Sequence, residues 1–337
     1  MKKLGIISLL LLLAVLGCKK DNNIAAYIYA DADVYVACRS FNGTKDVAKV
    51  LKNGTVIFST DGKNNASANA VFVTPLGDIY TAGYESNGSH IVAKVWKNGQ
   101  PYFQTNGQND AKIKSVYVTS SGDVYIAGYE NNGTYNVAKI WKNGQLYFQT
   151  NGLSSATVNS IYVSTTGNVY AAGESGAGGY YHATIWKNGQ PIFQANSANH
   201  SYATSIMVTA SEDVYTGGYE QSGNYNLVNV WKNSQIYFQT TQQDDAVANG
   251  LAISSTGDIY LSGRKIAPDD DIAKVWKNGT VIFSTDGKQN SGAMSVVTSG
   301  TDVYFAGYEG PNAKLWRNGK GITVAVGVAF SVFVVPH

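Results

Sequence analysis

The sequence predicts an all-β fold, a seven-bladed β-propeller with four antiparallel strands in each blade. Three observations lead to this prediction. One motif recurs at a nearly constant spacing, each period holds four short runs rich in β-branched and aromatic residues, and tight-turn residues separate the runs. A period of about 40–50 residues is typical of propeller blades and helical solenoids, and the strand-like runs favour the propeller.

Two motifs define the period. Successive copies of Asp-(Val/Ile)-Tyr are 45 residues apart five times and 44 residues apart once. These copies begin at Asp33, Asp78, Asp123, Asn168, Asp213, Asp258 and Asp302. The second motif, Ala-Lys-(Val/Ile)-Trp-Lys-Asn-Gly, keeps the same step, with its aromatic residue at Trp96, Trp141, Trp186, Trp231 and Trp276; Leu51 stands in the first copy, and Trp316 in the last copy, which is a few residues shorter. One such unit cannot bury both faces of its sheet, so stability is expected from neighbours packing around a ring.

Each unit reads as four strands joined by tight turns. In one copy the strand-like runs cover residues 114–119, 123–127, 135–141 and 145–150. Asn143-Gly144 separates the last two runs, and Asn-Gly is the preferred pair for a type I′ hairpin. After residue 17, no stretch places apolar residues at helical spacing over a useful length, so no helix is predicted there.

The units resemble the bacterial β-propeller repeats of the NHL and related secreted types, and more loosely WD40 repeats. The resemblance covers residues 24–335 and implies an innermost strand that precedes a Gly-Asp or Gly-Asn turn. It implies the architecture only, because such blades serve many unrelated functions. Two segments compete to supply the innermost strand of the first blade, residues 25–29 and 329–335. The second is favoured because it keeps the order Ser-Val-aromatic-Val found at Ser115 and Ser160.

The N-terminus predicts secretion and a lipid anchor. A basic start and an apolar run from Leu4 to Leu16 describe a signal peptide over residues 1–17, which is removed. Residues 15–18, Val-Leu-Gly-Cys, resemble the bacterial lipobox, which implies that Cys18 becomes the acylated first residue. We therefore expect residues 18–23 to form a short tether and residues 24–337 a single propeller domain. The expected location is the bacterial outer membrane, on its periplasmic side or at the cell surface.

Charge and cysteine content limit the partners. The chain has 25 Lys and Arg against 23 Asp and Glu, and removal of residues 1–17 deletes Lys2 and Lys3 only, which leaves a neutral balance. Such a chain lacks the basic excess that nucleic acid binding needs. The second cysteine, Cys38, replaces a Gly of the other repeats and is expected to be a buried, inert thiol. We expect a monomer.

The residues that recur in every unit are expected to serve the scaffold. The Asp of Asp-(Val/Ile)-Tyr is predicted to accept backbone N–H bonds in its turn, and the Trp to pack between blades. The cation after the Trp predicts a basic ring on the tight-turn face, either a solvated rim or a contact for anionic lipid or polysaccharide: Lys52, Lys97, Lys142, Lys187, Lys232, Lys277 and Arg317.

Candidate binding residues lie in the longer loops on the opposite face, where the units differ. After the second strand, four units read Gly-Tyr-Glu, and the others carry Arg39-Ser40, Glu174-Ser175 and Arg264-Lys265. Tyr offers a stacking face and a hydroxyl, and Glu an acceptor, which suits recognition of a sugar or peptide. The candidate ligand-binding residues are Tyr84, Glu85, Tyr129, Glu130, Tyr219, Glu220, Tyr308, Glu309, Tyr181 and His182.

No sequence feature indicates catalysis, a metal or a cofactor. The four His residues stand singly, without a partner at ligand spacing, and residues 269–271 lack the alternating pattern of a calcium loop. The sequence therefore predicts a non-enzymatic binding module for a glycan or another surface ligand. The alternative is a protein interaction scaffold at the outer membrane, and the third possibility is a polysaccharide-degrading enzyme.

Overall fold

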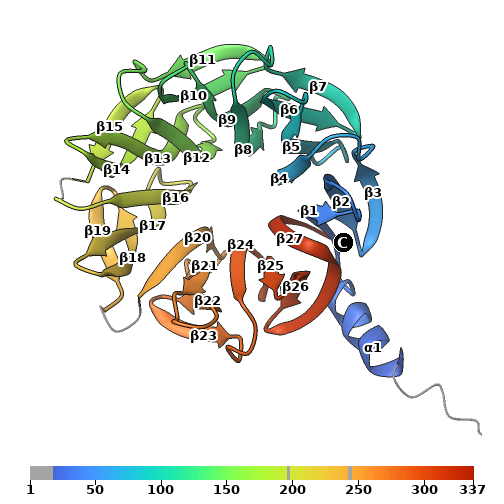
Figure 1. Ribbon diagram of the computed structural model, residues 1–337. Coiled ribbons are helices and arrows are strands. Elements are labelled where there is room, and N and C mark those ends of the chain that lie inside the picture. The colour runs from blue at the N-terminus through green and yellow to red at the C-terminus, as the bar shows by residue number, and fades with distance from the viewer. Residues whose placement is uncertain (1–17, 196–197, 242–244) are drawn as a thin grey trace, which may run out of the picture.

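The computed structural model describes residues 18–195, 198–241 and 245–337, so the predicted signal peptide lies outside the described residues. Over these ranges the chain forms one helix and 27 strands. The strands make five four-stranded antiparallel sheets and one seven-stranded sheet, arranged radially around a common centre (Figure 1). The all-β prediction is confirmed.

The five four-stranded sheets follow one another along the chain. The first contains β4 (Ala66–Val73), β5 (Ile79–Ser86), β6 (Ile91–Lys97) and β7 (Gln100–Gln104), and the second β8 (Ala111–Val118), β9 (Val124–Asn131), β10 (Asn136–Lys142) and β11 (Gln145–Gln149). The third contains β12 (Ala156–Val163), β13 (Val169–Ala177), β14 (Tyr180–Lys187) and β15 (Gln190–Gln194), and the fourth β16 (Ser201–Val208), β17 (Val214–Ser222), β18 (Tyr225–Lys232) and β19 (Gln235–Gln239). The fifth contains β20 (Ala246–Ile253), β21 (Ile259–Lys265), β22 (Ile272–Lys277) and β23 (Thr280–Ser284). In each sheet the first strand is innermost (Figure 1).

The seven-stranded sheet joins the two ends of the chain. It contains β24 (Ser291–Ser299), β25 (Asp302–Glu309), β26 (Asn312–Arg317), β27 (Lys320–Pro336), β1 (Ala32–Phe41), β2 (Asp46–Lys52) and β3 (Thr55–Ser59), in that order. The first part of β27 pairs with β26, and its second part pairs with β1 from Gly327 to Pro336. Closure by the C-terminal segment is thereby confirmed, because residues 329–335 form the innermost strand beside β1.

A serine in the innermost strands connects neighbouring sheets. The Ser115 hydroxyl accepts a hydrogen bond from the backbone N–H of Ile161 in the next sheet, at 3.2 Å. Ser331 of β27 accepts the equivalent bond from Val71 at 3.4 Å, and Ser295 accepts one from Val332 at 3.3 Å. The C-terminal strand therefore takes part in the same inter-sheet bonding as the other innermost strands. This bonding explains the recurrence of Ser in the Ser-Val-aromatic-Val order.

The predicted turns and inter-sheet packing are also present. Asn143 and Gly144 have φ of +50° and +81°, the positive values that a type I′ hairpin requires at both central residues. Trp96 packs on Phe58 of the preceding sheet, with ring centroids 5.2 Å apart, and Trp141 packs in the same way on Phe103. The core therefore lies between the sheets rather than within any one of them.

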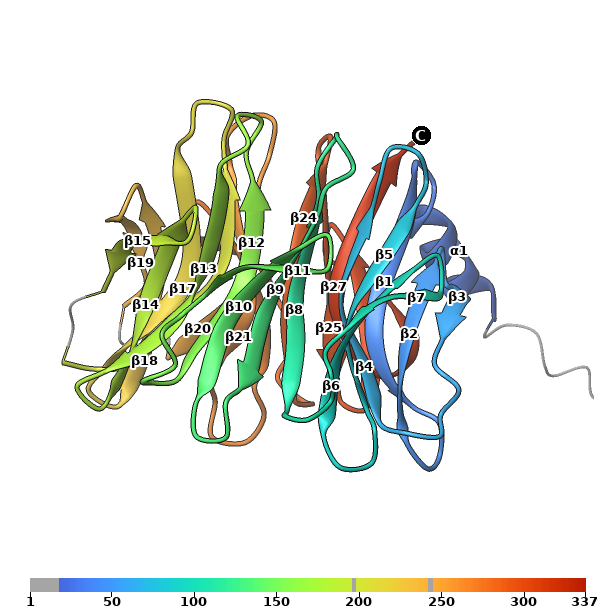
Figure 2. The same ribbon diagram turned by 90° about the horizontal axis from the view of Figure 1, so that it is seen from above.

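One helix was not predicted. Helix α1 (Cys18–Ile28) includes both the expected tether and the residues that competed as a first strand. Ile24, Tyr27 and Ile28 lie at helical spacing and pack on the core between β1 and β27, which explains why so short a segment is helical. The helix lies outside the ring beside β1–β3 (Figure 2). No helix in the described residues is long and apolar enough to span a membrane.

The cations of the predicted ring lie at the tight turns, partly exposed, and most of them are paired with carboxylates, so the ring carries little net positive charge. Lys52 Nζ lies 2.7 Å from the Asp33 carboxylate, and the same pair recurs in most units. The Asp side chain accepts from Lys52 and from Asn53 rather than from backbone N–H groups, whereas the Asn53 oxygen accepts the N–H of Val34. The recurring Asp, Lys and Asn thus form one structural unit that fixes the hairpin.

In the sheet of β12–β15 the lysine of the hairpin has a different carboxylate partner. This sheet carries Asn168 in place of the Asp, so Lys187 lacks its usual partner. Glu212, from the turn of the next sheet, accepts hydrogen bonds from Thr166 and Tyr170 and lies 3.8 Å from Lys187 Nζ. Hydrogen bonds to Thr166 and Tyr170 lower the pKa of Glu212 to about 2. The carboxylate missing from one unit is supplied by its neighbour.

Candidate functional site

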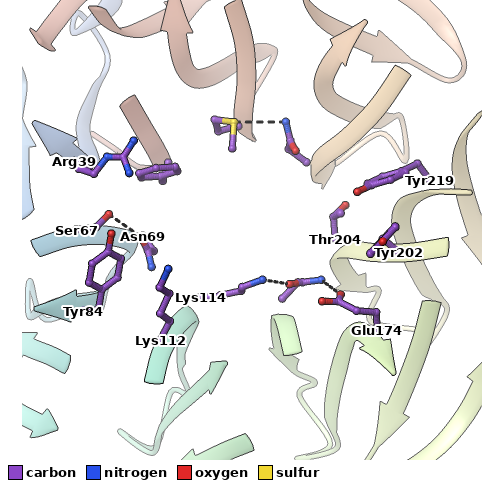
Figure 3. A pocket seen from close by; sticks show the side chains of 14 residues that line it. Arg39, Ser67, Asn69, Tyr84, Lys112, Lys114, Glu174, Tyr202, Thr204 and Tyr219 are labelled. Atoms are coloured by element: carbon purple, nitrogen blue, oxygen red, sulfur yellow. Dashed lines mark hydrogen bonds between the residues drawn. The ribbon is translucent and has the colours of Figure 1, made fainter. Parts of the chain in front are cut away.

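A cavity of about 560 Å³ lies at the centre of the ring, on the face of the longer loops (Figure 3). Every sheet contributes to its lining, which combines amides, cations, one carboxylate and aromatic rings. This volume is within the range of about 300–1,000 Å³ that is usual for ligand pockets.

The innermost strands place one side chain each in this central cavity by means of a β-bulge. In β4 the register shifts between Ala68 and Ala70, so Asn69 has no partner on β5. The strands are tightly apposed there, since a Cβ added to Gly83 would lie 1.9 Å from the carbonyl oxygen of Ser67. The bulge turns the extra residue toward the centre. The equivalent residues in chain order are Asn69, Lys114, Asn159, Thr204, Asn249, Met294 and Phe330.

Three of the bulged residues are asparagines that also hold neighbouring sheets together. The amide nitrogens of Asn69, Asn159 and Asn249 donate to the backbone carbonyls of the next innermost strand, at 2.8, 2.9 and 3.0 Å. These side chains are therefore fixed in position before any ligand binds. A preorganised polar lining reduces the entropic cost of binding.

A chain of hydrogen bonds crosses one side of the cavity. Lys114 Nζ donates to Asn159 Oδ1 at 2.7 Å, and Asn159 Nδ2 donates to Glu174 Oε2 at 2.6 Å. Burial lowers the pKa of Lys114 and raises the pKa of Glu174, since each group is partly removed from water. Lys114 and Glu174 are thus held as buried ionisable groups in the cavity wall.

Aromatic rings form a continuous track into the cavity. Tyr202 of β16 stacks on Tyr219 of β17, with centroids 4.9 Å apart and planes inclined by 28°. His200 stacks on the outer side of Tyr202, and Tyr181 contacts both rings. Tyr202 and Tyr219 line the cavity, and Tyr181 is exposed, so the track extends from the centre to the surface.

Two of the four predicted tyrosines reach the cavity. Tyr84 and Tyr219 line it, together with Arg39 and Glu174, which occupy the same position in their own units. Tyr129 and Tyr308 are at the equivalent positions of β9 and β25 but are not part of its wall, and burial raises the pKa of each. The tyrosine of the Gly-Tyr-Glu motif therefore faces the cavity in two of its four copies.

The predicted glutamates do not join the site. Glu85 Oε2 lies 2.6 Å from Lys94 Nζ, and Glu130 Oε2 lies 2.7 Å from Lys139 Nζ. Strand alternation explains this result, because consecutive side chains point to opposite faces of a sheet. Glu309 pairs in the same way with Lys314, and Glu220 has no place in the cavity wall.

The last two predicted residues lie apart from the cavity wall. Tyr181 belongs to the aromatic track, and its backbone N–H donates to His200 Nδ1 at 3.0 Å. His182 lies with Nε2 3.1 Å from the carbonyl oxygen of Ala177, and its ring takes no part in the track. Within the described ranges, no group of three or more His, Cys, Asp or Glu residues could hold a metal ion.

Sequence reasoning missed the cavity residues of the innermost strands. Lys114 was placed in an ordinary strand and Lys112, Asn159 and Tyr202 were not singled out, although these are positions where otherwise similar units differ. The available signal was the residue three places after the small residue that opens each inner strand, which recurs at a step of 45 residues from Asn69 to Met294 but differs in kind between units. The identity of this residue varies more than the residues of the tight-turn face do.

The fold and the site together define an all-β protein of repeated four-stranded sheets, built as β-propellers are, with a polar and aromatic cavity at its centre. It is similar in fold to the β-propeller domain of the trilobed protease from Pyrococcus furiosus, with a TM-score of 0.51 and 12% identity over 87% of this chain and 91% of that one. It is equally similar to an ulvan lyase of polysaccharide lyase family PL25, with a TM-score of 0.51 and 9% identity over 90% of this chain and 91% of that one.

A protein of unknown function from Bacteroides caccae gives a TM-score of 0.49 and 11% identity over 91% of this chain and all of that one. No protein-family model and no curated protein matches the sequence. At these identities the likeness to solved structures extends to the fold alone.

Proposed function

We propose that this protein is a seven-bladed β-propeller that acts as a binding module and takes a saccharide in its central cavity. The seven-stranded sheet counts as two blades that share β27, which with the five other sheets accounts for all seven repeats. One observation carries the functional proposal. The side chains that line the cavity differ from blade to blade, whereas the tight-turn face repeats the same residues.

The cavity lining has the chemistry that sugars require. Pyranose rings present an apolar face to aromatic side chains and hydroxyls to amides, and Tyr202, Tyr219, Asn69 and Asn249 supply both kinds of group. One of the similar folds, the ulvan lyase, has been solved bound to an acidic saccharide. The saccharide was bound to the lyase, and it supports the proposal only as an example of a ligand held by a protein of similar fold.

Filling the cavity tests this proposal. Thr204→Trp would place an indole at a bulge position, while Leu146→Trp would place the same group on the exposed outer strand β11. Both variants and the parent protein are screened on a glycan microarray after thermal melting has shown that they are folded. We expect the parent and the Leu146 variant to retain the same saccharides and the Thr204 variant to lose them. Equal retention by all three would place any saccharide site outside the cavity.

A catalytic role is a second candidate, and it depends on Glu174. Its carboxyl group is buried in the cavity wall and its pKa is raised, as is common for acid catalysts. However, hydrolysis of a glycosidic bond usually employs two carboxylates, and Glu174 is the one carboxylate among the described lining residues. Incubation with acidic and neutral polysaccharides, followed by assay of new reducing ends, separates the two functions. If the parent protein cleaves a polysaccharide and the Glu174→Gln variant does not, the protein is an enzyme rather than a binding module.

The scaffold alternative rests on a different surface. The outer strands expose apolar side chains, among them Leu146, Ile236 and Tyr237, each at least 40% accessible. Exposed apolar edge strands are common sites of protein association. Capture of one protein partner that is lost on Ile236→Asp and kept in the Thr204 variant would favour this alternative.

We also propose that the protein is lipid-anchored through Cys18 at the bacterial outer membrane. The support is the lipobox-like sequence before Cys18. Because α1 begins at Cys18 and its last turn packs against β27, an acyl group there would hold the propeller close to the membrane rather than on a long tether.

A further inference from the structure

The cations of the central cavity are gathered on one side. Arg39 of β1 and Lys112 of β8 lie on the side opposite Glu174, Tyr202 and Tyr219, whereas Lys114 of β8 reaches toward Glu174 through Asn159 (Figure 3). Among the described lining residues there are three cations and a single carboxylate. The cavity therefore has a positive half and an aromatic half, although the whole chain is nearly neutral.

These cations lack the close carboxylate partners that other cations of the protein have. Over the described residues, no carboxylate lies within ion-pair distance of Lys112 or Lys114, and Arg39 Nε is 3.7 Å from Asp46. By contrast, Arg264, which occupies the position of Arg39 in a later blade, lies 2.7 Å from Asp271. Among the described residues, the positive half is thus balanced by looser contacts than the other cations have, Asp46 beside Arg39 and the nearby charge of Asp110 on Lys112.

The like charges also crowd one another. Lys112 Nζ lies 4.9 Å from the centre of the Tyr84 ring, and this contact holds the ammonium group over the cavity. Burial lowers the pKa of Lys112; the nearby carboxylate of Asp110 opposes this shift, and the charge of Arg39 adds to it. A bound anion would favour the charged form of Lys112 and offset this repulsion.

We propose that the ligand is an acidic saccharide whose carboxylate or sulfate group binds Arg39 and Lys112 while a sugar unit packs against the aromatic pair of Tyr202 and Tyr219. This inference rests on the proposed function and specifies its ligand class. Guanidinium and ammonium groups bind such anions through charge-assisted hydrogen bonds. The track through His200 to Tyr181 supplies stacking faces for further sugar units, so an oligosaccharide suits the site better than a monosaccharide.

The experiment compares saccharides that differ in charge alone. Titration calorimetry is performed with tetragalacturonate and its methyl ester, and separately with a carrageenan tetrasaccharide and its desulfated form. The variants are Arg39→Gln and Lys112→Gln, which keep much of each side chain. Lys45→Gln is the matched control, since Lys45 is an exposed cation on the same face and is not part of the cavity wall.

We expect one charged tetrasaccharide to bind at least about tenfold more tightly than its uncharged form, and each cavity variant to lose about tenfold, which corresponds to one charge-assisted hydrogen bond. The affinity of the parent protein for the charged tetrasaccharide should fall as the salt concentration rises, and the Lys45 variant should bind it as tightly as the parent does. The pair that shows the difference identifies carboxylate or sulfate as the group recognised.

Two results would overturn the inference in distinguishable ways. If the uncharged forms bind as tightly as the charged ones, or if the cavity variants bind like the parent, the ligand is not recognised by its charge, and the proposed saccharide site survives alone. If no saccharide of any kind binds, on the array or in the titrations, the proposed function fails and this inference fails with it.

Discussion

Removal of residues 329–335 should open the ring. These residues form six of the nine registered pairs between β1 and β27 and include the buried Ala329 and Val332. At about 0.5–1.5 kcal/mol net for each backbone hydrogen bond, the lost ladder costs about 3–9 kcal/mol. Burial of Val332 adds about 1.5–3 kcal/mol. The total is comparable with the whole stability of a typical domain, about 5–15 kcal/mol, so cooperative folding should be lost.

The matched deletion removes residues 22–30 from the other end. It eliminates most of α1, including the buried Ile28 and the carbonyl of Tyr27 that accepts from Arg317 at 2.6 Å. The ring itself stays closed, so we expect a cost of only about 3–6 kcal/mol, the sum of one buried aliphatic side chain and one charge-assisted bond. Urea unfolding followed by circular dichroism measures both deletions.

A point substitution keeps the test informative if the deletion yields no folded protein. Val332→Ala should cost about 1–3 kcal/mol because it removes buried methyl groups. Val326→Ala, on the same strand but 54% exposed, should change stability by less than about 0.5 kcal/mol. The reasoning is refuted if the N-terminal deletion is the more damaging, or if the two valine substitutions cost the same.

Three further predictions concern single residues. Glu212→Gln, which keeps a side chain at this position of positive φ (+63°), should lower the melting temperature at pH 7, and adding Asn168→Asp should restore it by recreating the usual pair with Lys187; recovery by the second change is the decisive result. Because the folded-state pKa of Glu212 is depressed to about 2, its contribution is present above the unfolded value near 4.5 and is lost as pH falls toward 2, so the variant and parent melts should converge at low pH. Cys38 is buried and burial raises its pKa to about 12, so it should react with a thiol reagent only at the rate of unfolding; rapid native reaction would contradict its placement. Cys18→Ser should abolish incorporation of an alkyne fatty acid in cells, and equal labelling of variant and parent would exclude Cys18 as the anchor.

The repeat explains how far the sequence could predict the fold. The strands, the hairpins and the inter-sheet position of Trp96 and Trp141 follow from patterns present several times in one chain, so each copy supports the others. Helix α1 occurs once and has only about three turns, so no repeated pattern marks it. Its helical form depends on tertiary contacts of Ile28, which a local pattern does not reveal.

The site was harder to predict for a geometric reason. The tyrosine position was found because the residue at this position varies between units. However, Tyr84 and Tyr129 share that position and only Tyr84 lines the cavity. Lys114 and Asn159 enter through a bulge that breaks the alternation of the strand, and a bulge is a property of two paired strands rather than of one run of residues. The ion pairs of Glu85 and Glu130 likewise depend on which residue the neighbouring strand places opposite.

The location of a bound saccharide tests the central claim most directly. Crystals of residues 18–337 are soaked with the tightest-binding oligosaccharide from the array, and difference density is examined over the whole surface. The account predicts density in the central cavity, with a sugar ring on Tyr202 and an anionic group within hydrogen-bond distance of Lys112. Density confined to the grooves between blades, such as the one lined by Glu85, Asn87 and Gln104, with an empty central cavity, would contradict it.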